Sequence, residues 1–464
     1  MDLHWLSASE LSSRYRAGEV SPVTVTEALL DRIHALDAKT NAFCLVDEIR
    51  ALDAAKASAE RYQAGQPLDA LDGVPVAIKD LLITEGWPTL RGSLSIDPKG
   101  SWDADAPAVA RLKEAGAVLI GKTTTPEFGW KGVTDNPLTG ITRNPWDLDK
   151  TPGGSSGGSS AALAAGFVPL ATGSDGGGSI RIPAAFAGVA GLKPSFGRVP
   201  AFPLSPFGTV AHVGPMARTV EDLALFLSVI ARPDARDWYH LPDGGRDWTR
   251  GLKEGVAGMR LAVSADLGYA NVDPEVTEAF EAAVDTFERL GAQITWIEPL
   301  FDDPVETFRA IWWSGANFLL EELPADQFDR LDPGLQSVVE RGAQISRRDY
   351  QEAVKAREAL GSQMRHFMED YDGLLTPSLA VPAFEVGTNA PGEEPGGDWE
   401  HWTPFSYPFN LTQQPAVSVP CGFTQSGLPI GVQIVGPMFD DAKVLRIAHA
   451  YEQATDWHLR HPEF

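Results

Sequence analysis

Apolar residues along the chain switch repeatedly between helical and strand spacing. Leu29, Ile33 and Leu36 recur at the spacing of an amphipathic helix, whereas Val74–Lys79 is a nearly continuous apolar run that predicts a short buried strand. Further predicted elements are helix Pro107–Ala115, strand Ala117–Ile120 and helix Ser159–Ala165. Alternation of this kind favours an α/β domain with a largely parallel sheet.

The ends of these elements also carry local signals. Ser7-Ala8-Ser9-Glu10 is a capping box, and Ser21-Pro22 places a cap residue before a proline at the first helical position. The first 60 residues therefore read as helices. Later predicted elements are strand Met259–Ser264, helix Val276–Leu290, a mostly helical stretch Asp303–Phe367, strand Gly373–Leu375, and a hairpin of Ala416–Phe423 and Pro429–Val435. Two stretches rich in glycine and proline, 232–258 and 386–403, are expected to be loops, the second a mobile surface loop.

Composition indicates a folded protein. The chain has 464 residues, 43% of them apolar, and 38 Lys+Arg against 63 Asp+Glu give a formal charge of −25. Such acidity opposes nucleic acid and anionic membrane surfaces as partners. No secretory signal and no apolar run of membrane-spanning length is visible, so we expect a cytoplasmic location. With two cysteines and nine scattered histidines, we expect no disulfide framework and no metal site.

Two familiar motifs need their structural context. Gly116–Thr123 matches the phosphate-binding pattern, but a helix precedes it and its middle is an apolar strand, the reverse of a phosphate-binding loop. Gly153–Gly157 matches the G-x-S-x-G elbow of the Ser-His-Asp hydrolases. The histidines that follow it in suitable order are His366, His401 and His449. That hydrolase class stays open as an alternative.

Two glycine- and serine-rich segments, Thr151–Ala161 and Thr172–Ala184, stand on either side of an apolar stretch, which ties both to buried structure. Three successive glycines in Gly176–Ser179 can turn backbone N–H groups toward one anion, and the serine beside them can act as a nucleophile. Pro183 suits the first turn of a following helix.

A serine nucleophile needs a base, and Lys79 is a candidate. A lysine among apolar residues loses charge stabilisation, so its pKa falls from about 10.4 toward neutrality. From composition alone, an exposed or ion-paired lysine is the commoner interpretation.

Three segments together resemble the amidase signature family: Gly73–Asp80, Thr151–Ser159 and Gly177–Ala184. Their order and spacing are similar to the family's, and the resemblance is dense from 71 to 219 and weaker from 373 to 437. It implies a large mixed, largely parallel twisted sheet covered by helices on both faces. We expect one domain, 1–464, comprising an N-terminal helical segment 1–65, a catalytic core 66–231, a mostly helical excursion 265–370 and returning strands 371–464.

The resemblance also implies roles for individual residues. Ser179 resembles the nucleophile, Lys79 the base, and Ser155 the bridging serine that follows a cis peptide bond. The implied oxyanion hole comprises the N–H groups of Gly176, Gly177, Gly178 and Ser179. Supporting positions are Ser156, Asp175 and Arg181, the last two by pairing. The implied substrate pocket comprises Phe128, Gly129, Trp130 and Val133, with Trp130 preferred.

One departure from the family lies beside the nucleophile, where Ser174-Asp175-Gly176 replaces the usual Thr-Asp-Thr and predicts a looser loop. Trp312, Trp313 and Trp402 are candidates for the leaving-group side of the pocket.

The expected activity is hydrolysis of a small, apolar or aryl amide, carbamates included, through an acyl-enzyme and without a cofactor. The alternative within the family is the glutaminase subunit of a tRNA-dependent amidotransferase. The segment Gly197–Pro203 is more similar to that of stand-alone amidases. By family resemblance a homodimer is expected, with no nucleic acid or membrane partner.

Overall fold

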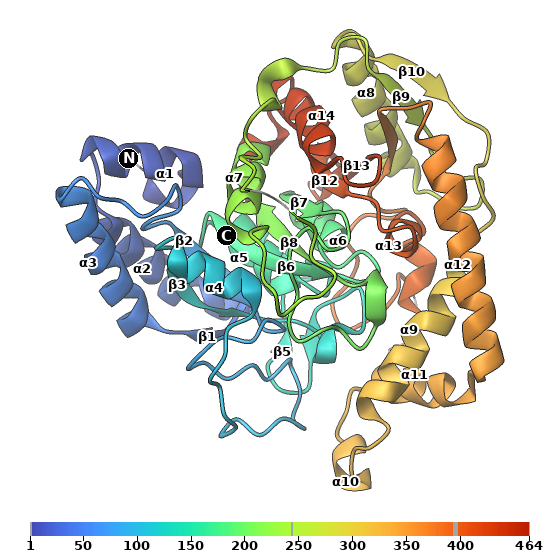
Figure 1. Cartoon of the computed structure of the whole chain (residues 1–464), viewed down its shortest axis with the longest axis horizontal. Helices are drawn as coiled ribbons and strands as arrows, with labels where there is room; N and C mark the ends of the chain where they lie inside the picture. Colours follow the sequence, from blue (N-terminus) through green and yellow to red (C-terminus); the bar gives the residue numbers. More distant parts are fainter. Residues whose placement is uncertain (1, 243–244, 393–397, 464) are drawn as a thin grey trace.

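A single large sheet organises the molecule. The computed structural model describes residues 2–242, 245–392 and 398–463. Within these residues eleven strands form one mixed sheet in the order β1-β3-β2-β6-β8-β7-β12-β13-β11-β9-β10, and β4 and β5 form a separate ladder. Figure 1 shows the helices α1–α3 at one end of the molecule and α9–α12 at the other. The sheet thus draws strands from both halves of the chain.

The strands are short, and most are buried. Their bounds are β1 Phe43–Val46, β2 Pro75–Lys79, β3 Val118–Thr123, β4 Asp135–Asn136, β5 Gly140–Ile141, β6 Leu170–Asp175, β7 Ala190–Lys193, β8 His212–Ala217, β9 Arg260–Val263, β10 Gln293–Trp296, β11 Gly373–Pro377, β12 Ala416–Phe423 and β13 Pro429–Val435.

The helices lie on both faces of this sheet. Their bounds are α1 Ala8–Ala17, α2 Pro22–Thr40, α3 Glu48–Gln63, α4 Pro107–Glu114, α5 Gly157–Ala164, α6 Arg181–Ala187, α7 Val220–Ile230, α8 Pro274–Arg289, α9 Val305–Leu320, α10 Ala325–Phe328, α11 Pro333–Gln344, α12 Arg347–Phe367, α13 Tyr407–Leu411 and α14 Asp441–Gln453. None of the helices described is long and apolar enough to cross a bilayer.

Alternation along the strands divides the core into two layers. Val76 and Ile78 of β2 belong to the apolar cluster that contains α4, α7 and α14, whereas Ala77 between them packs in the cluster of α5 and α6. Successive strand residues point to opposite faces, so each face acquires its own helical cover. A third cluster joins α11 and α9, which carries Trp312, to Phe128, next to the site described below.

The α/β class, the large mixed sheet and the helices on both faces are confirmed, but the expectation of a largely parallel sheet is wrong. Six of the ten pairings in the described sheet are antiparallel, and four are parallel. The reason is connectivity. β12 and β13 form a hairpin and a loop joins β7 to β8, whereas parallel neighbours need a longer crossover.

Local signals located most elements correctly. Ser7 and Glu10 form the predicted capping box, Ser21 caps α2, and the strand ending at Lys79 is β2. The segment 116–123 contains β3, and the Lys122 ammonium lies 3.3 Å from the Asp80 carboxylate in the core, so its structural interpretation is confirmed.

Two expectations about the chain's organisation are wrong. The first 60 residues are not all helical, because β1 pairs antiparallel with β3 between two helices. The stretch 386–403 is not simply a surface loop. It ends in a short helical turn, Trp399–Trp402, whose two tryptophans are buried because they pack against aromatic and glycine-loop residues. Residues 393–397 of that stretch lie outside those described.

Candidate active site

The site forms where two parallel strands end side by side. Lys79 is the last residue of β2 and Asp175 the last of β6, and these strands are parallel neighbours. The backbone N–H of Lys79 donates to Thr172 Oγ1 at 2.9 Å, which fixes the end of β2 against β6. Carboxyl ends of parallel strands meet at one edge of a sheet, so the lysine and the glycine-rich loop after β6 come together there.

Three hydroxyl groups surround the Lys79 amine. Nζ lies 2.8 Å from Ser155 Oγ and 2.9 Å from both Ser156 Oγ and Ser174 Oγ. No carboxylate of the described residues forms an ion pair with it, and its side chain is fully buried. These hydroxyls can partner either form, because an ammonium would donate to all three, whereas an uncharged amine would donate to two and accept from the third.

Burial favours the uncharged form of the Lys79 amine. It lowers the pKa of this lysine well below its ordinary value, and the charge of Asp175 opposes the shift without cancelling it. An amine that is uncharged at neutral pH can accept a proton from a neighbouring hydroxyl.

The first serine-rich segment carries Ser155 two residues before α5, which begins at Gly157. The peptide bond between Gly154 and Ser155 is cis, as the resemblance implied. Ser155 and Ser179 both line one cavity, and the N–H of Ser156 donates to the carbonyl of Ser179 at 3.2 Å, joining the two loops. No direct hydrogen bond between the Ser155 and Ser179 hydroxyls is present among the described residues. Catalytic hydrogen bonds commonly tighten only when substrate binds.

The glycine loop between β6 and α6 differs from the expected oxyanion hole at one position. The N–H of Gly178 donates to Asp175 Oδ1 at 2.8 Å, so this group is already occupied and does not point at a ligand. The N–H groups of Gly176, Gly177 and Ser179 have no acceptor among the described residues. These three donors remain for an anion.

Asp175 and Arg181 hold this loop in place. Two hydrogen bonds of 3.0 Å join the guanidinium to the carboxylate, which also accepts from Asn410 Nδ2 at 2.8 Å. Burial alone would raise the pKa of Asp175, but the positive charge and hydrogen bonds of Arg181 lower it below its usual value. Arg181 also donates to the Ser406 carbonyl and to Gln433. The loop is thereby fastened to α13 and β13.

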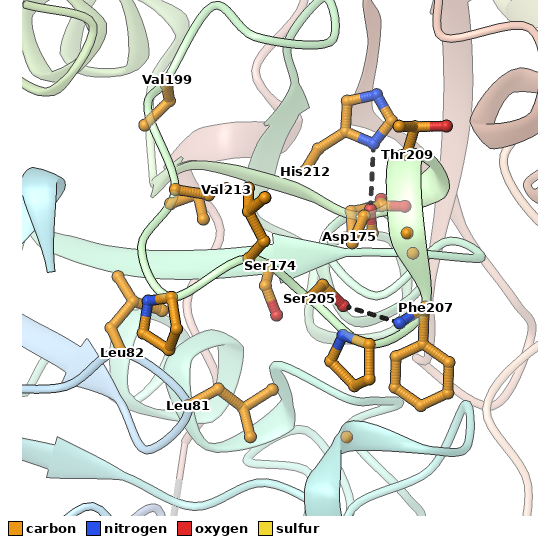
Figure 2. A pocket seen from close by; sticks show the side chains of 18 of the residues that line it. Leu81, Leu82, Ser174, Asp175, Val199, Ser205, Phe207, Thr209, His212 and Val213 are labelled. Carbon is orange, nitrogen blue, oxygen red and sulfur yellow. Dashed lines mark hydrogen bonds between the residues drawn. The ribbon is translucent and has the colours of Figure 1, made fainter. Parts of the chain in front are cut away.

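A cavity of about 270 Å³ opens in front of the serines. Its lining includes Ser155, Ser179 and Gly176, and most of its wall is apolar. Figure 2 shows Leu81, Leu82 and Val199 on one side of this cavity and Phe207 and Thr209 on the other, with Ser174 between them. The segment from Ser195 to Thr209 supplies much of the outer wall, including the expected Gly197–Pro203.

The expected substrate pocket is only partly in this cavity. Phe128 and Gly129 line it, whereas Trp130 and Val133 do not and are buried behind it. The Trp130 carbonyl accepts a hydrogen bond from Trp312 Nε1 at 3.2 Å, and it is Trp312 that reaches the cavity wall. Of the other aromatic candidates, Trp402 stacks on Phe186, and Trp313 lies under the Arg309 and Arg341 guanidinium groups.

Among the described residues, no histidine is placed as a base toward a serine. His366, His401 and His449 lie outside the cavity lining. His212, which sequence reasoning did not single out, does line it, but its Nδ1 lies 2.8 Å from the Val210 carbonyl and 3.2 Å from that of Asp175. Burial, with the nearby charge of Lys193, lowers the pKa of His212 well below its ordinary value. With carbonyls as partners, Nδ1 carries the proton, and His212 fixes the end of β6.

Ser174 and Arg91 are further cavity residues that sequence reasoning missed as site residues. Ser174 drew notice only as a departure from the family, although its place before Asp175 was a usable signal. Arg91 gave no signal, because only the fold brings its loop beside Phe128.

A buried lysine next to serine hydroxyls, beside a loop whose backbone N–H groups have no acceptor among the described residues, is an arrangement that suits a serine hydrolase with a lysine base. Such a site can activate a hydroxyl, hold a developing oxyanion and return a proton to a leaving group. Because the cavity is largely apolar, the site suits a substrate with an acyl group and an apolar body.

Comparison with known proteins gives the family. The sequence model described as Amidase matches residues 24–445. The "Acylamidase" of Rhodococcus erythropolis is 38% identical over 99% of this chain and 98% of its own length. A glutamyl-tRNA(Gln) amidotransferase subunit of Myxococcus xanthus is also 38% identical, over 99% of each chain. The chain therefore belongs to the amidase signature family and is an amide hydrolase.

Solved structures agree with this assignment. A bacterial aryl acylamidase of the amidase signature family superposes with a TM-score of 0.92 at 30% identity, covering 99% of this chain and 98% of that one. A 6-aminohexanoate cyclic dimer hydrolase complexed with substrate gives a TM-score of 0.90 at 29% identity, covering 100% and 99%. The similar proteins thus include both hydrolases and amidotransferase subunits.

Proposed function

We propose that this protein is a stand-alone amidase that releases ammonia or an amine from a small apolar or aryl amide. The observation that carries the proposal is the fully buried Lys79 amine, 2.8 Å from Ser155 Oγ, behind an apolar cavity whose lining includes Ser155 and Ser179. This arrangement needs neither a metal ion nor a histidine to activate a hydroxyl.

The proposed reaction passes through an acyl-enzyme. Lys79 takes a proton from Ser155, which takes one from Ser179 as Ser179 Oγ bonds to the amide carbonyl carbon. Ser155 then gives its proton to the departing nitrogen as the carbon–nitrogen bond breaks, and recovers a proton from the Lys79 ammonium. Water attacks the ester by the reverse relay, which releases the acid and restores both serines.

The oxyanion formed during this attack lies next to the glycine loop. The N–H groups of Gly176, Gly177 and Ser179 are its proposed donors, since none has an acceptor among the described residues. Gly178 acts indirectly, because its N–H bond to Asp175 fixes the direction of the other three.

Gly178→Ala is expected to lower kcat by roughly 100-fold or more, because moving the loop displaces the neighbouring N–H donors and the loss of one oxyanion donor has about that effect. Gly178 has φ +128°, and a Cβ there would lie 2.5 Å from Ser406 Oγ, so the loop must move. Gly140→Ala is the matched control, because that glycine also has positive φ (+80°) but open space around it. Steady-state kinetics with circular dichroism on both variants make the measurement, and an unchanged kcat in Gly178→Ala contradicts the proposed hole.

The apolar wall supports the proposed substrate class. Leu81, Leu82, Val199, Val213, Phe207 and Trp312 form much of it. Burying an aryl or alkyl group there contributes about 25 cal/mol per Å² of apolar surface, which acetamide has little of. Phe128 and Gly129 lie on the same cavity wall.

The alternative is a glutaminase subunit that supplies ammonia to a partner, supported by a relative of equal identity with an amidotransferase role. Glutamine is charged at its α-amino and α-carboxylate groups, whereas the described cavity lining is mostly apolar and has Arg91 as its one basic side chain among lysines and arginines.

A substrate panel on the purified chain separates the two. We expect 4-nitroanilides of acetate to octanoate to be hydrolysed at least about tenfold better, in kcat/KM, than acetamide or glutamine, which corresponds to about 1.4 kcal/mol. Ser179→Ala supplies the background rate. Similar turnover of acetamide and an anilide would argue against the apolar class. Hydrolysis of glutamine alone, and only with an added amidotransferase partner, would favour the glutaminase role.

A further inference from the structure

Arg91 stands at the cavity wall in a rigid backbone setting. Its N–H donates to Asp80 Oδ2 at 2.8 Å, and its carbonyl accepts from the N–H of Phe128 at 2.8 Å. Its φ is +54°, so the chain reverses sharply at this residue. Both bonds leave the side chain uncommitted while fixing its Cα beside the strand end that carries Lys79.

The guanidinium of Arg91 has no partner among the described residues. Within them no hydrogen bond or ion pair is formed by its side chain, and it is the one lysine or arginine in the cavity lining. Asp80, the carboxylate that acts on it electrostatically, already lies 3.3 Å from the Lys122 ammonium. The cluster of Arg91, Lys122 and Asp80 therefore contains two basic side chains and one carboxylate.

Three buried arginines of the chain, in contrast, have partners for their guanidinium groups. Arg198 pairs with Asp441, Arg218 donates to the carbonyls of Leu6 and Val168, and Arg181 pairs with Asp175. Arg91 is only partly buried, and its nitrogens are not among the fully buried atoms that lack a partner, so the guanidinium still reaches the solvent of the cavity. Burial does lower the pKa of Arg91, yet an arginine stays charged at neutral pH. An unsatisfied guanidinium on a binding cavity therefore suits an anionic ligand.

We propose that Arg91 is a specificity-determining residue that recognises a carboxylate on the amide substrate. The planar fork of a guanidinium matches a carboxylate with two parallel hydrogen bonds, and such charge-assisted bonds are stronger than neutral ones. The inference rests on the proposed function and refines it: the preferred substrate has an apolar body and an acidic end.

The place of Arg91 also indicates where that acid would lie. Its carbonyl holds Phe128, and the next residue, Gly129, has its ideal Cβ position 3.3 Å from Ser155 Oγ and 2.7 Å from Leu81 Cδ1. The Phe128–Gly129 segment thus lies between the backbone of Arg91 and Ser155. We therefore place the carboxylate at the end of the substrate remote from the scissile bond.

Two matched substrate pairs test this. For an acid on the acyl side, the mono-4-nitroanilide of glutaric acid is compared with pentanoyl 4-nitroanilide. For an acid on the amine side, 4-(butyrylamino)benzoate is compared with butyranilide. We expect the acidic member of at least one pair to have a kcat/KM roughly 10- to 100-fold higher, the range for hydrogen bonds to a charged group. Arg91→Met should abolish that preference, mainly through KM, and change the neutral members less than threefold. Arg91→Lys should retain part of it.

The outcomes are distinguishable from failure of the proposed function. No preference in either pair, or an equal loss for acidic and neutral members in Arg91→Met, would overturn the role of Arg91 while Ser179-dependent anilide hydrolysis stands. If no amide is hydrolysed, titration calorimetry of the same compounds on Ser179→Ala, with and without Arg91→Met, decides the question without turnover. Melting temperatures check that the variants fold.

Discussion

Ser179→Ala is expected to reduce amide hydrolysis by about 10⁴- to 10⁶-fold, the range measured when a catalytic serine is removed. In the proposed mechanism, the covalent bond between enzyme and substrate is formed by Ser179 Oγ. Ser406, whose hydroxyl also lies beside the glycine loop, donates to the Gly177 carbonyl at 2.6 Å and is not part of the cavity lining. Folding should survive, since the Ser179 side chain makes no hydrogen bond to the described residues. The measurement is steady-state turnover of the best anilide, with mass spectrometry of a slowly deacylating ester to detect the acyl-enzyme.

Ser205→Ala is the matched control. This serine also lines the cavity, yet its hydroxyl only accepts a hydrogen bond from the N–H of Phe207 and is not bonded to Lys79. It should keep its activity within about threefold and should still form the acyl adduct. Wild-type-like turnover in Ser179→Ala, or an adduct on another serine, would show that the nucleophile lies elsewhere.

Lys79→Met is expected to lower kcat by about 10²- to 10⁴-fold, the contribution of a general base. Methionine has nearly the same length and no proton acceptor, so the three hydroxyls around Nζ lose the group that links them. Activity that persists in this variant and disappears in His212→Ala would instead indicate a histidine-dependent hydrolase.

The same variant should also reveal the protonation state of Lys79 through stability. The pKa of Lys79 is lowered by burial in the folded state, whereas an unfolded lysine titrates near 10.4. Between these two pKa values the unfolded chain binds one more proton, so the lysine's contribution to stability rises with pH by up to about 1.4 kcal/mol per unit. Lys79→Met has no such dependence. Its free energy of unfolding minus that of wild type should therefore be largest near neutral pH and shrink toward pH 10.

Chemical denaturation at several pH values between 7 and 10 measures this difference. Lys355→Met, at an exposed position of α12, is the control and should show no change with pH. A difference for Lys79→Met that stays constant over the same range would mean that the folded lysine is protonated, contrary to the proposed relay.

Sequence predicted the parts of the fold that local chemistry decides. Caps such as Ser7 and the apolar run ending at Lys79 depend on neighbours in the chain, so they were visible. Strands β7 and β8 were not predicted, because Ala190–Lys193 has only four residues and Gly214-Pro215 interrupts the other. Without them, the antiparallel centre of the sheet could not be foreseen.

The candidate site shows the same division. Glycine runs and the spacing of Lys79 and the two serines pointed to the right segments. Directions of individual N–H groups, such as that of Gly178 toward Asp175, follow from tertiary packing and were not accessible. Trp130 shows a further limit. A large aromatic next to a site in sequence can serve as backing for the residue that reaches the cavity, here Trp312.

The anchoring of Arg181 has a consequence for biosynthesis. Its acceptors Ser406, Asn410 and Gln433 lie 225 to 252 positions further along the chain, so the loop that carries Ser179 cannot be braced until they have been translated and folded. During translation, Lys79, Ser155 and Ser179 are synthesised before the residues that brace the glycine loop. We therefore expect hydrolytic activity to appear only after the chain up to Gln433 has been synthesised and folded.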